Sequence, residues 1–170
     1  MDRRSTIVVG APGGEPFAAR GALPPADVLA VLVDSSVDTH GAFRRRQHDV
    51  REALERDGTV VLLVGPRIAE GLGTQFGCWV RAKIGLDIMP WFDGRPMVDG
   101  RVGYAALRFF GDPPRGATEL ARSRECLLAG VRFPGDCSDI IVYPAPRDLD
   151  ATVTRELVEH LARVGSGAPA

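Results

Sequence analysis

DVLAVLVD, residues 27–34, is an uninterrupted apolar run between two aspartates. A strand without a polar face is buried on both sides, which is typical of the centre of a parallel sheet. The run Thr59–Val64 repeats the pattern and is closed by Gly65-Pro66. The two runs therefore predict two neighbouring central strands.

The residues between these runs favour a helix from Ala42 to Arg56. Its apolar face carries Phe43, Val50 and Leu54, at helical spacing, and Gly58 follows as the expected stop. Strand, helix and strand in succession predict a right-handed βαβ unit, because parallel neighbours need a crossover of this length.

Further elements flank this unit. Thr6–Val9 is a short β-branched run that predicts a first strand, and Tyr104–Phe110 is a weaker strand pattern. Cys126–Phe133 and Asp139–Tyr143 flank a Pro-Gly-Asp turn and predict a hairpin. Gln75–Ile84 has the spacing of a short helix.

The clearest helix in the sequence is the last one, from Ala151 to Val164. Asp150 is its expected N-cap and Gly165 its end. The predicted buried stripe contains Val153, Leu157, Leu161 and Val164.

These elements predict one α/β domain over residues 1–165, followed by a small-residue tail over 166–170. We expect a three-layer sandwich with a mostly parallel, flavodoxin-like sheet built from the strands near residues 6, 28, 59 and 139. The run near residue 127 is expected to add an antiparallel edge.

Composition excludes several classes of protein. The 170 residues include 21 basic and 22 acidic ones, a net charge of −1, so no overall field draws the chain to nucleic acid or to an anionic membrane. No apolar stretch reaches the roughly 20 residues that span a bilayer. The odd set Cys78, Cys126 and Cys137 predicts no disulfide framework and fits a reducing cytoplasm. We expect neither a metal nor a cofactor.

The first candidate ligand site is the turn that carries Gly10, Gly13 and Gly14, directly after the first strand. Glycines at the carboxyl end of a parallel strand let backbone N–H groups approach a phosphate. Arg44, Arg45 and Arg46 would supply positive charge. The turn lacks the spacing of known nucleotide-binding loops, and a purely structural Pro/Gly turn is the simpler interpretation.

The second candidate is a set of reactive groups. Asp34 ends a central strand, His40 follows it, and Cys78 stands in Gly77-Cys78-Trp79. A thiol acts as a nucleophile only with a lowered pKa and a nearby base. The alternatives are a solvated loop around Asp34 and core packing for Cys78.

The third candidate is a surface for a protein partner. Trp91 and Phe92 lie in the irregular segment 87–103, and exposed aromatic residues there would form a binding patch. Burial of both residues in the core is the alternative.

The pattern from Asp27 to Gly65, together with the late strand Ile140–Pro144 and the terminal helix, resembles the class I glutamine amidotransferase-like superfamily, especially its ThuA-like branch. The resemblance covers about half of the chain and implies a flavodoxin-like sheet. Catalytic members carry a Cys on a Gly-flanked elbow and a His-x-Glu pair, and this chain has neither. The resemblance therefore implies a degenerate member retained for binding.

Three functions remain open from the sequence. The leading hypothesis is a non-catalytic module that binds a protein partner, or itself, or a small regulatory ligand. The second is a small hydrolase or transferase that uses Cys78 or Asp34 with His40. The third is nucleotide or anion binding by the Gly-rich turn.

Overall fold

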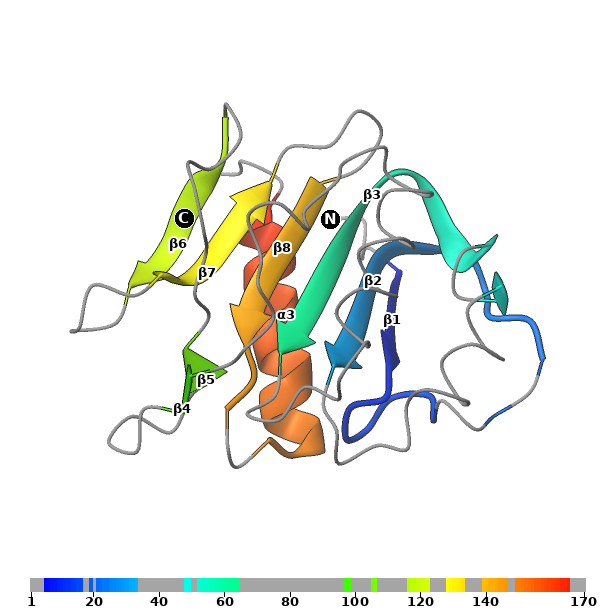
Figure 1. The fold of residues 1–170 in the computed structure, drawn as a ribbon. Helices are drawn as coiled ribbons and strands as arrows, with labels where there is room; N and C mark the ends of the chain where they lie inside the picture. The colour runs from blue at the N-terminus through cyan, green and yellow to red at the C-terminus, as the bar shows by residue number, and fades with distance from the viewer. Residues whose placement is uncertain are drawn as a thin grey trace.

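The computed structural model of the chain describes residues 5–16, 19, 21–33, 48–49, 52–64, 97–98, 105–106, 116–122, 128–133, 139–146 and 149–165. Its centre is a six-stranded sheet with the strand order β1-β2-β3-β8-β7-β6 (Figure 1). The strands are β1 Thr6–Val9, β2 Ala26–Val33, β3 Leu54–Val64, β6 Thr118–Arg122, β7 Leu128–Phe133 and β8 Asp139–Pro144.

The first four strands of this order run parallel, β7 runs antiparallel to them, and β6 runs antiparallel to β7. β1 pairs with β2, β2 with β3, and β3 with β8, all in parallel. β8, β7 and β6 then pair in antiparallel fashion. The predicted α/β class, the mostly parallel sheet and the antiparallel edge are confirmed.

The order of the parallel strands differs from that of a flavodoxin-like sheet. There the first strand lies between the second and the third. Here β2 lies between β1 and β3.

The βαβ prediction is confirmed in its two strands, since β2 and β3 are parallel neighbours in register from Val28–Thr59 to Val33–Val64.

The helix predicted to reach Arg56 ends earlier. His48, Asp49, Glu52 and Ala53 are helical, but β3 begins at Leu54, which pairs with Ala26. Gly58 consequently lies inside β3 and is not the helix stop that the sequence predicts. The pairing with β2 overrides a helix propensity that is a weak determinant on its own.

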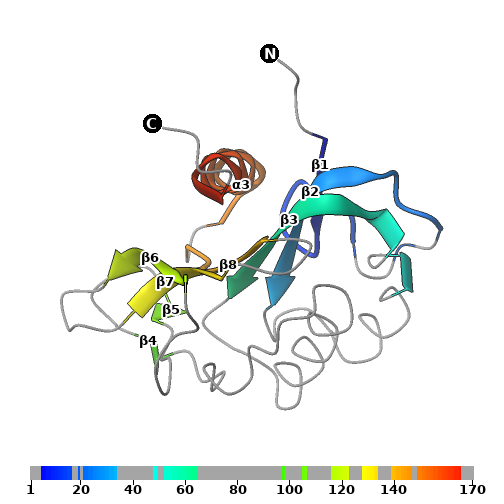
Figure 2. The ribbon, with the colours of Figure 1, turned by 90° about the horizontal axis from the view of Figure 1, so that it is seen from above.

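One helix, α3 Ala151–Gly165, covers one face of the sheet over β3 and β8 (Figure 2). The apolar cluster beneath it contains alternate residues of the strands, Val28, Ala30 and Leu32 from β2 and Val61 and Leu63 from β3. The intervening residues, such as Leu29, Val31 and Val60, are also fully buried. Both faces of the parallel strands are therefore buried, as the apolar runs predict.

The buried stripe of α3 is rotated from the predicted one. Thr154, Val158, Leu161 and Ala162 are buried, whereas Val164 is 36% exposed. Val153 and Leu157 are half-buried. The helix contacts β3 and β8 through a face centred near Val158 and Leu161, and Val164 falls outside that face.

A second, small sheet pairs β4 Met97–Val98 with β5 Ala105–Ala106. It lies beside β7, on the side of the large sheet away from α3 (Figure 2). β5 falls within the strand predicted from Tyr104 to Phe110. The predicted helix over 75–84 lies outside the described residues, as does the tail over 166–170.

Candidate functional site

The carboxyl ends of the four parallel strands meet at one edge of the sheet, where ligands of α/β proteins usually bind. Of the residues predicted to form a site, Gly10, Gly13 and Gly14 are described, and they follow β1 at this edge. The others lie outside the described residues and stay predictions: Asp34, His40, Arg44, Arg45, Arg46, Cys78, Trp91 and Phe92. The candidate site therefore consists of the turn and its neighbours.

The turn after β1 is a tight one. The carbonyl oxygen of Ala11 accepts a hydrogen bond of 3.0 Å from the N–H of Gly14, so Pro12 and Gly13 occupy the two central positions. Gly13 has a φ of 78°, which the third position of a type II turn requires and which L side chains disfavour. The Pro-Gly pair in the sequence predicts this geometry directly.

After the turn, the chain returns along β1. The N–H of Glu15 donates to the Val8 carbonyl at 2.7 Å, and the N–H of Gly10 donates to the Glu15 carbonyl at 2.8 Å. These two bonds form a parallel bridge between Val9 and Glu15. Gly14 permits the approach, because a Cβ there would lie 2.5 Å from the Val8 carbonyl oxygen.

The hydrogen bonds of this turn determine what it can hold. The N–H groups of Gly10, Gly14 and Glu15 all donate to carbonyl oxygens of the same segment. A phosphate-binding loop instead directs several N–H groups toward the ligand. These three groups are therefore structural in this conformation.

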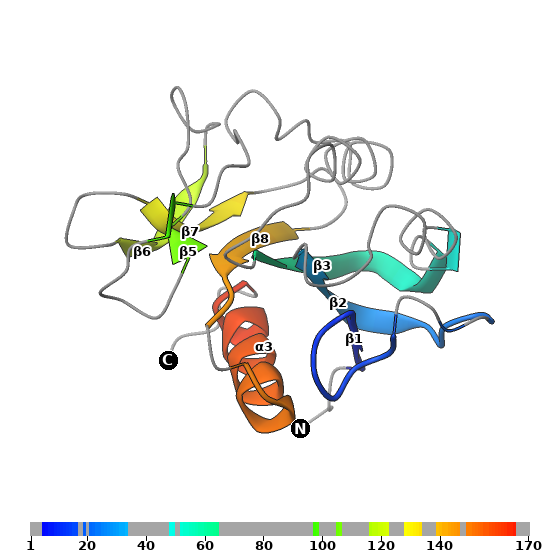
Figure 3. The ribbon, with the colours of Figure 1, turned by 60° about the horizontal axis from the view of Figure 1, so that its bottom comes forward.

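The turn also packs against α3, which begins at this edge of the sheet (Figure 3). A Cβ on Gly13 would lie 2.7 Å from the Cβ of Ala151, the first residue of the helix. Position 13 therefore favours glycine for two reasons: glycine adopts the positive φ, and its lack of a Cβ leaves room for Ala151. This contact joins two segments at opposite ends of the sequence.

The amino end of α3 is capped as the sequence predicts. One carboxylate oxygen of Asp150 accepts hydrogen bonds from the N–H groups of Thr152 and Val153, each at 2.8 Å. The buried Thr154 hydroxyl donates to the Asp150 carbonyl at 2.6 Å. The negative carboxylate meets the positive end of the helix dipole, which is the place where a bound anion would otherwise sit.

Two charged contacts lie at the opposite, amino edge of the parallel strands. Arg132 on β7 forms an ion pair with Asp139 on β8, with its Nε 3.0 Å from the carboxylate. The Asp27 carboxylate accepts hydrogen bonds from the N–H and the hydroxyl of Ser5 at 2.8 and 3.0 Å. Each contact joins two neighbouring segments of the sheet, so Arg132, Asp139 and Asp27 have a structural role here.

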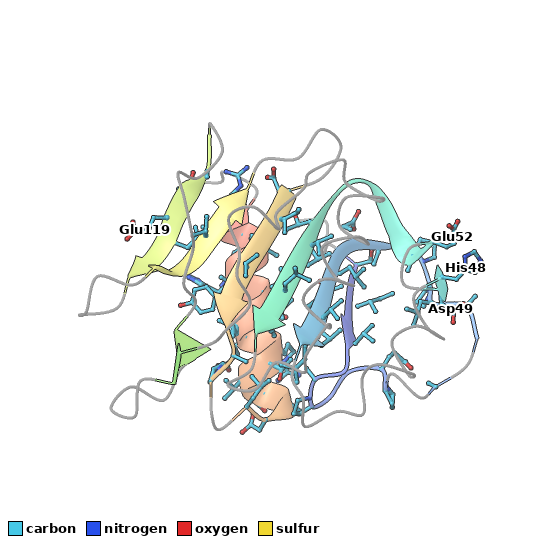
Figure 4. The ribbon with its side chains drawn as sticks, viewed as in Figure 1. His48, Asp49, Glu52 and Glu119 are labelled. Atoms are coloured by element: carbon cyan, nitrogen blue, oxygen red, sulfur yellow. The ribbon has the colours of Figure 1, made fainter. Side chains whose placement is uncertain are left out.

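The labelled acidic and histidine side chains do not converge on one place. His48, Asp49 and Glu52 lie together beside the start of β3, while Glu119 lies on β6 at the far side of the sheet (Figure 4). His48 and Glu52 are exposed. Within the described ranges, no group of three or more His, Cys, Asp or Glu side chains is arranged to hold a metal ion.

The sequence did not point to Glu15 as the residue that closes the turn. Its contribution is made by its backbone, so its side-chain type carries no signal. The contact between Gly13 and Ala151 likewise depends on the tertiary fold and not on a local pattern.

Among the residues that the structure describes, no helix has the length and apolar character needed to cross a membrane.

The resemblance to the class I glutamine amidotransferase-like superfamily rests on the strands around β2 and β3 and on the end of the chain. Those strands and α3 are present, and the superfamily assignment itself stays a prediction. No protein-family model, no curated protein and no solved structure matches the chain.

Proposed function

We propose that the chain is a non-catalytic α/β module that binds a protein partner. The observation that supports this proposal is the geometry of the turn over residues 10–15. In a ligand-binding sheet this turn faces the ligand, whereas here its Gly10, Gly14 and Glu15 N–H groups bond within the segment. A degenerate member retained for binding is also what the superfamily resemblance implies.

The partner surface that we propose includes Trp91 and Phe92. Aromatic side chains contribute most to protein interfaces when they stand exposed and insert into a partner. The partner is either another protein or a second copy of this chain, which contacts the segment over residues 87–110.

The experiment compares the full chain with a variant that carries Trp91→Ala and Phe92→Ala. Light scattering coupled to size-exclusion chromatography detects self-association, and affinity capture followed by mass spectrometry detects a partner. We expect the variant to lose the complex while keeping the circular dichroism spectrum of the wild type. Val164→Ala, which alters an exposed apolar residue of α3, is the matched control and is expected to bind normally.

Two results would contradict the proposal in different ways. A wild-type chain that is monomeric and recovers no partner argues against the binding module as a whole. A wild-type complex that survives both aromatic substitutions argues only against the surface at Trp91 and Phe92.

One contact favours a second candidate function, the binding of a small anion. The packing of Gly13 on Ala151 brings the Gly-rich turn beside the amino end of α3, whose dipole attracts negative charge. Arg44, Arg45 and Arg46 would supply the remaining charge. The Asp150 carboxylate, which already caps the helix, weighs against it.

Thermal unfolding with phosphate and with nucleotides tests this candidate. A ligand present at 100 times its Kd stabilises the folded chain by about 2.7 kcal/mol, which raises the melting temperature by several degrees. We expect that rise to vanish when Arg44, Arg45 and Arg46 are changed to Gln. An unchanged melting temperature at millimolar ligand would remove the candidate.

A further inference from the structure

We draw no further inference here: the strongest candidate, the junction between the Gly10–Glu15 turn and the first turn of α3, belongs to the site already described, and its Asp150-capped helix end has nothing beside it in the described part of the chain that points to a ligand.

Discussion

The parallel half of the sheet and its antiparallel edge are held together by different interactions. The parallel half consists of β1, β2, β3 and β8, and together with α3 it contains the largest fully buried side chains of the described residues: Leu29, Leu63, Ile140, Ile141 and Leu161. The antiparallel edge consists of β7 and β6, where Glu119 is exposed and Gly130 lies against the Tyr143 ring.

This difference teaches where the stability of the fold resides. Burial of apolar side chains stabilises the parallel half, and its loss leaves cavities. The edge depends on cross-strand pairs, whose individual contributions are smaller. Substitutions in the two regions should therefore differ in size.

The largest effect is expected for Leu161→Ala, under the centre of α3. Leu161 is 2% exposed and belongs to the cluster between α3 and the sheet. The cavity should lower the free energy of unfolding by about 2–5 kcal/mol, measured by urea denaturation. Val164→Ala, on the exposed side of the same helix, should change it by less than about 0.5 kcal/mol. Equal effects would mean that α3 does not pack through this face.

Gly13→Ala should come next, because it strains the backbone and collides with α3. The positive φ and the close Ala151 Cβ together predict a loss of about 1–3 kcal/mol. Adding Ala151→Gly should restore part of the loss, since the collision with the Cβ disappears while the φ penalty stays. Strictly additive effects in this double-mutant cycle would show that the turn does not touch α3.

Gly130→Ala tests the antiparallel edge in the same way. A Cβ there would lie 2.5 Å from the Tyr143 ring, and Gly130 and Tyr143 each lie one position beyond the Val131–Val142 pair of β7 and β8. Displacement of the ring should lower stability by about 1–2 kcal/mol. Tyr143→Ala alone removes packing, so the double variant should be less destabilised than the sum of the two. If the losses of the two single variants simply add in the double variant, the Tyr143 ring does not contact residue 130.

Asp150→Ala should cost about 1 kcal/mol, because it removes the acceptor for the N–H groups of Thr152 and Val153. Asp150→Ser keeps an N-cap acceptor and serves as the control. Thermal denaturation should separate the two variants by several degrees. A serine variant as unstable as the alanine variant would show that the cap contributes little.

The smallest effect is expected for the Arg132–Asp139 pair at the edge. The two side chains are 29% and 25% exposed, so solvent screens their attraction. A double-mutant cycle with Arg132→Gln and Asp139→Asn should give a coupling below about 1 kcal/mol that weakens at high salt. A coupling energy larger than the loss of unfolding free energy in Leu161→Ala would show that the antiparallel edge contributes more to stability than the parallel half.

The same two regions differ in how well the sequence predicts them. The parallel strands are continuous apolar runs, and α3 has a strong helical period with an N-cap, so their places follow from local pattern. β6 was not predicted, because Thr118-Glu119-Leu120-Ala121-Arg122 mixes residues that are poor strand formers. Its strand forms through pairing with β7, which no local pattern encodes.

The errors within predicted elements have similar causes. The apolar spacing continues to Leu54 and predicts a helix up to Arg56, but the pairing of Leu54 with Ala26 ends the helix before that residue. Helical period alone places Val164 in the buried stripe of α3, whereas the contacts of α3 with β3 and β8 set the face that is buried. In the candidate site, the sequence predicts the position of the Gly-rich turn, but not the contacts that close it. That closure depends on Val8 and Ala151, which approach the turn only in the folded chain.

The return of Glu15 along β1 has a consequence for aggregation. An edge strand with free backbone groups is a template on which other chains polymerise. Glu15 occupies the Val8 carbonyl and the Gly10 N–H, so an incoming strand would first have to displace it. At the carboxyl end of β1, pairing with another chain therefore competes with a contact that this chain already makes.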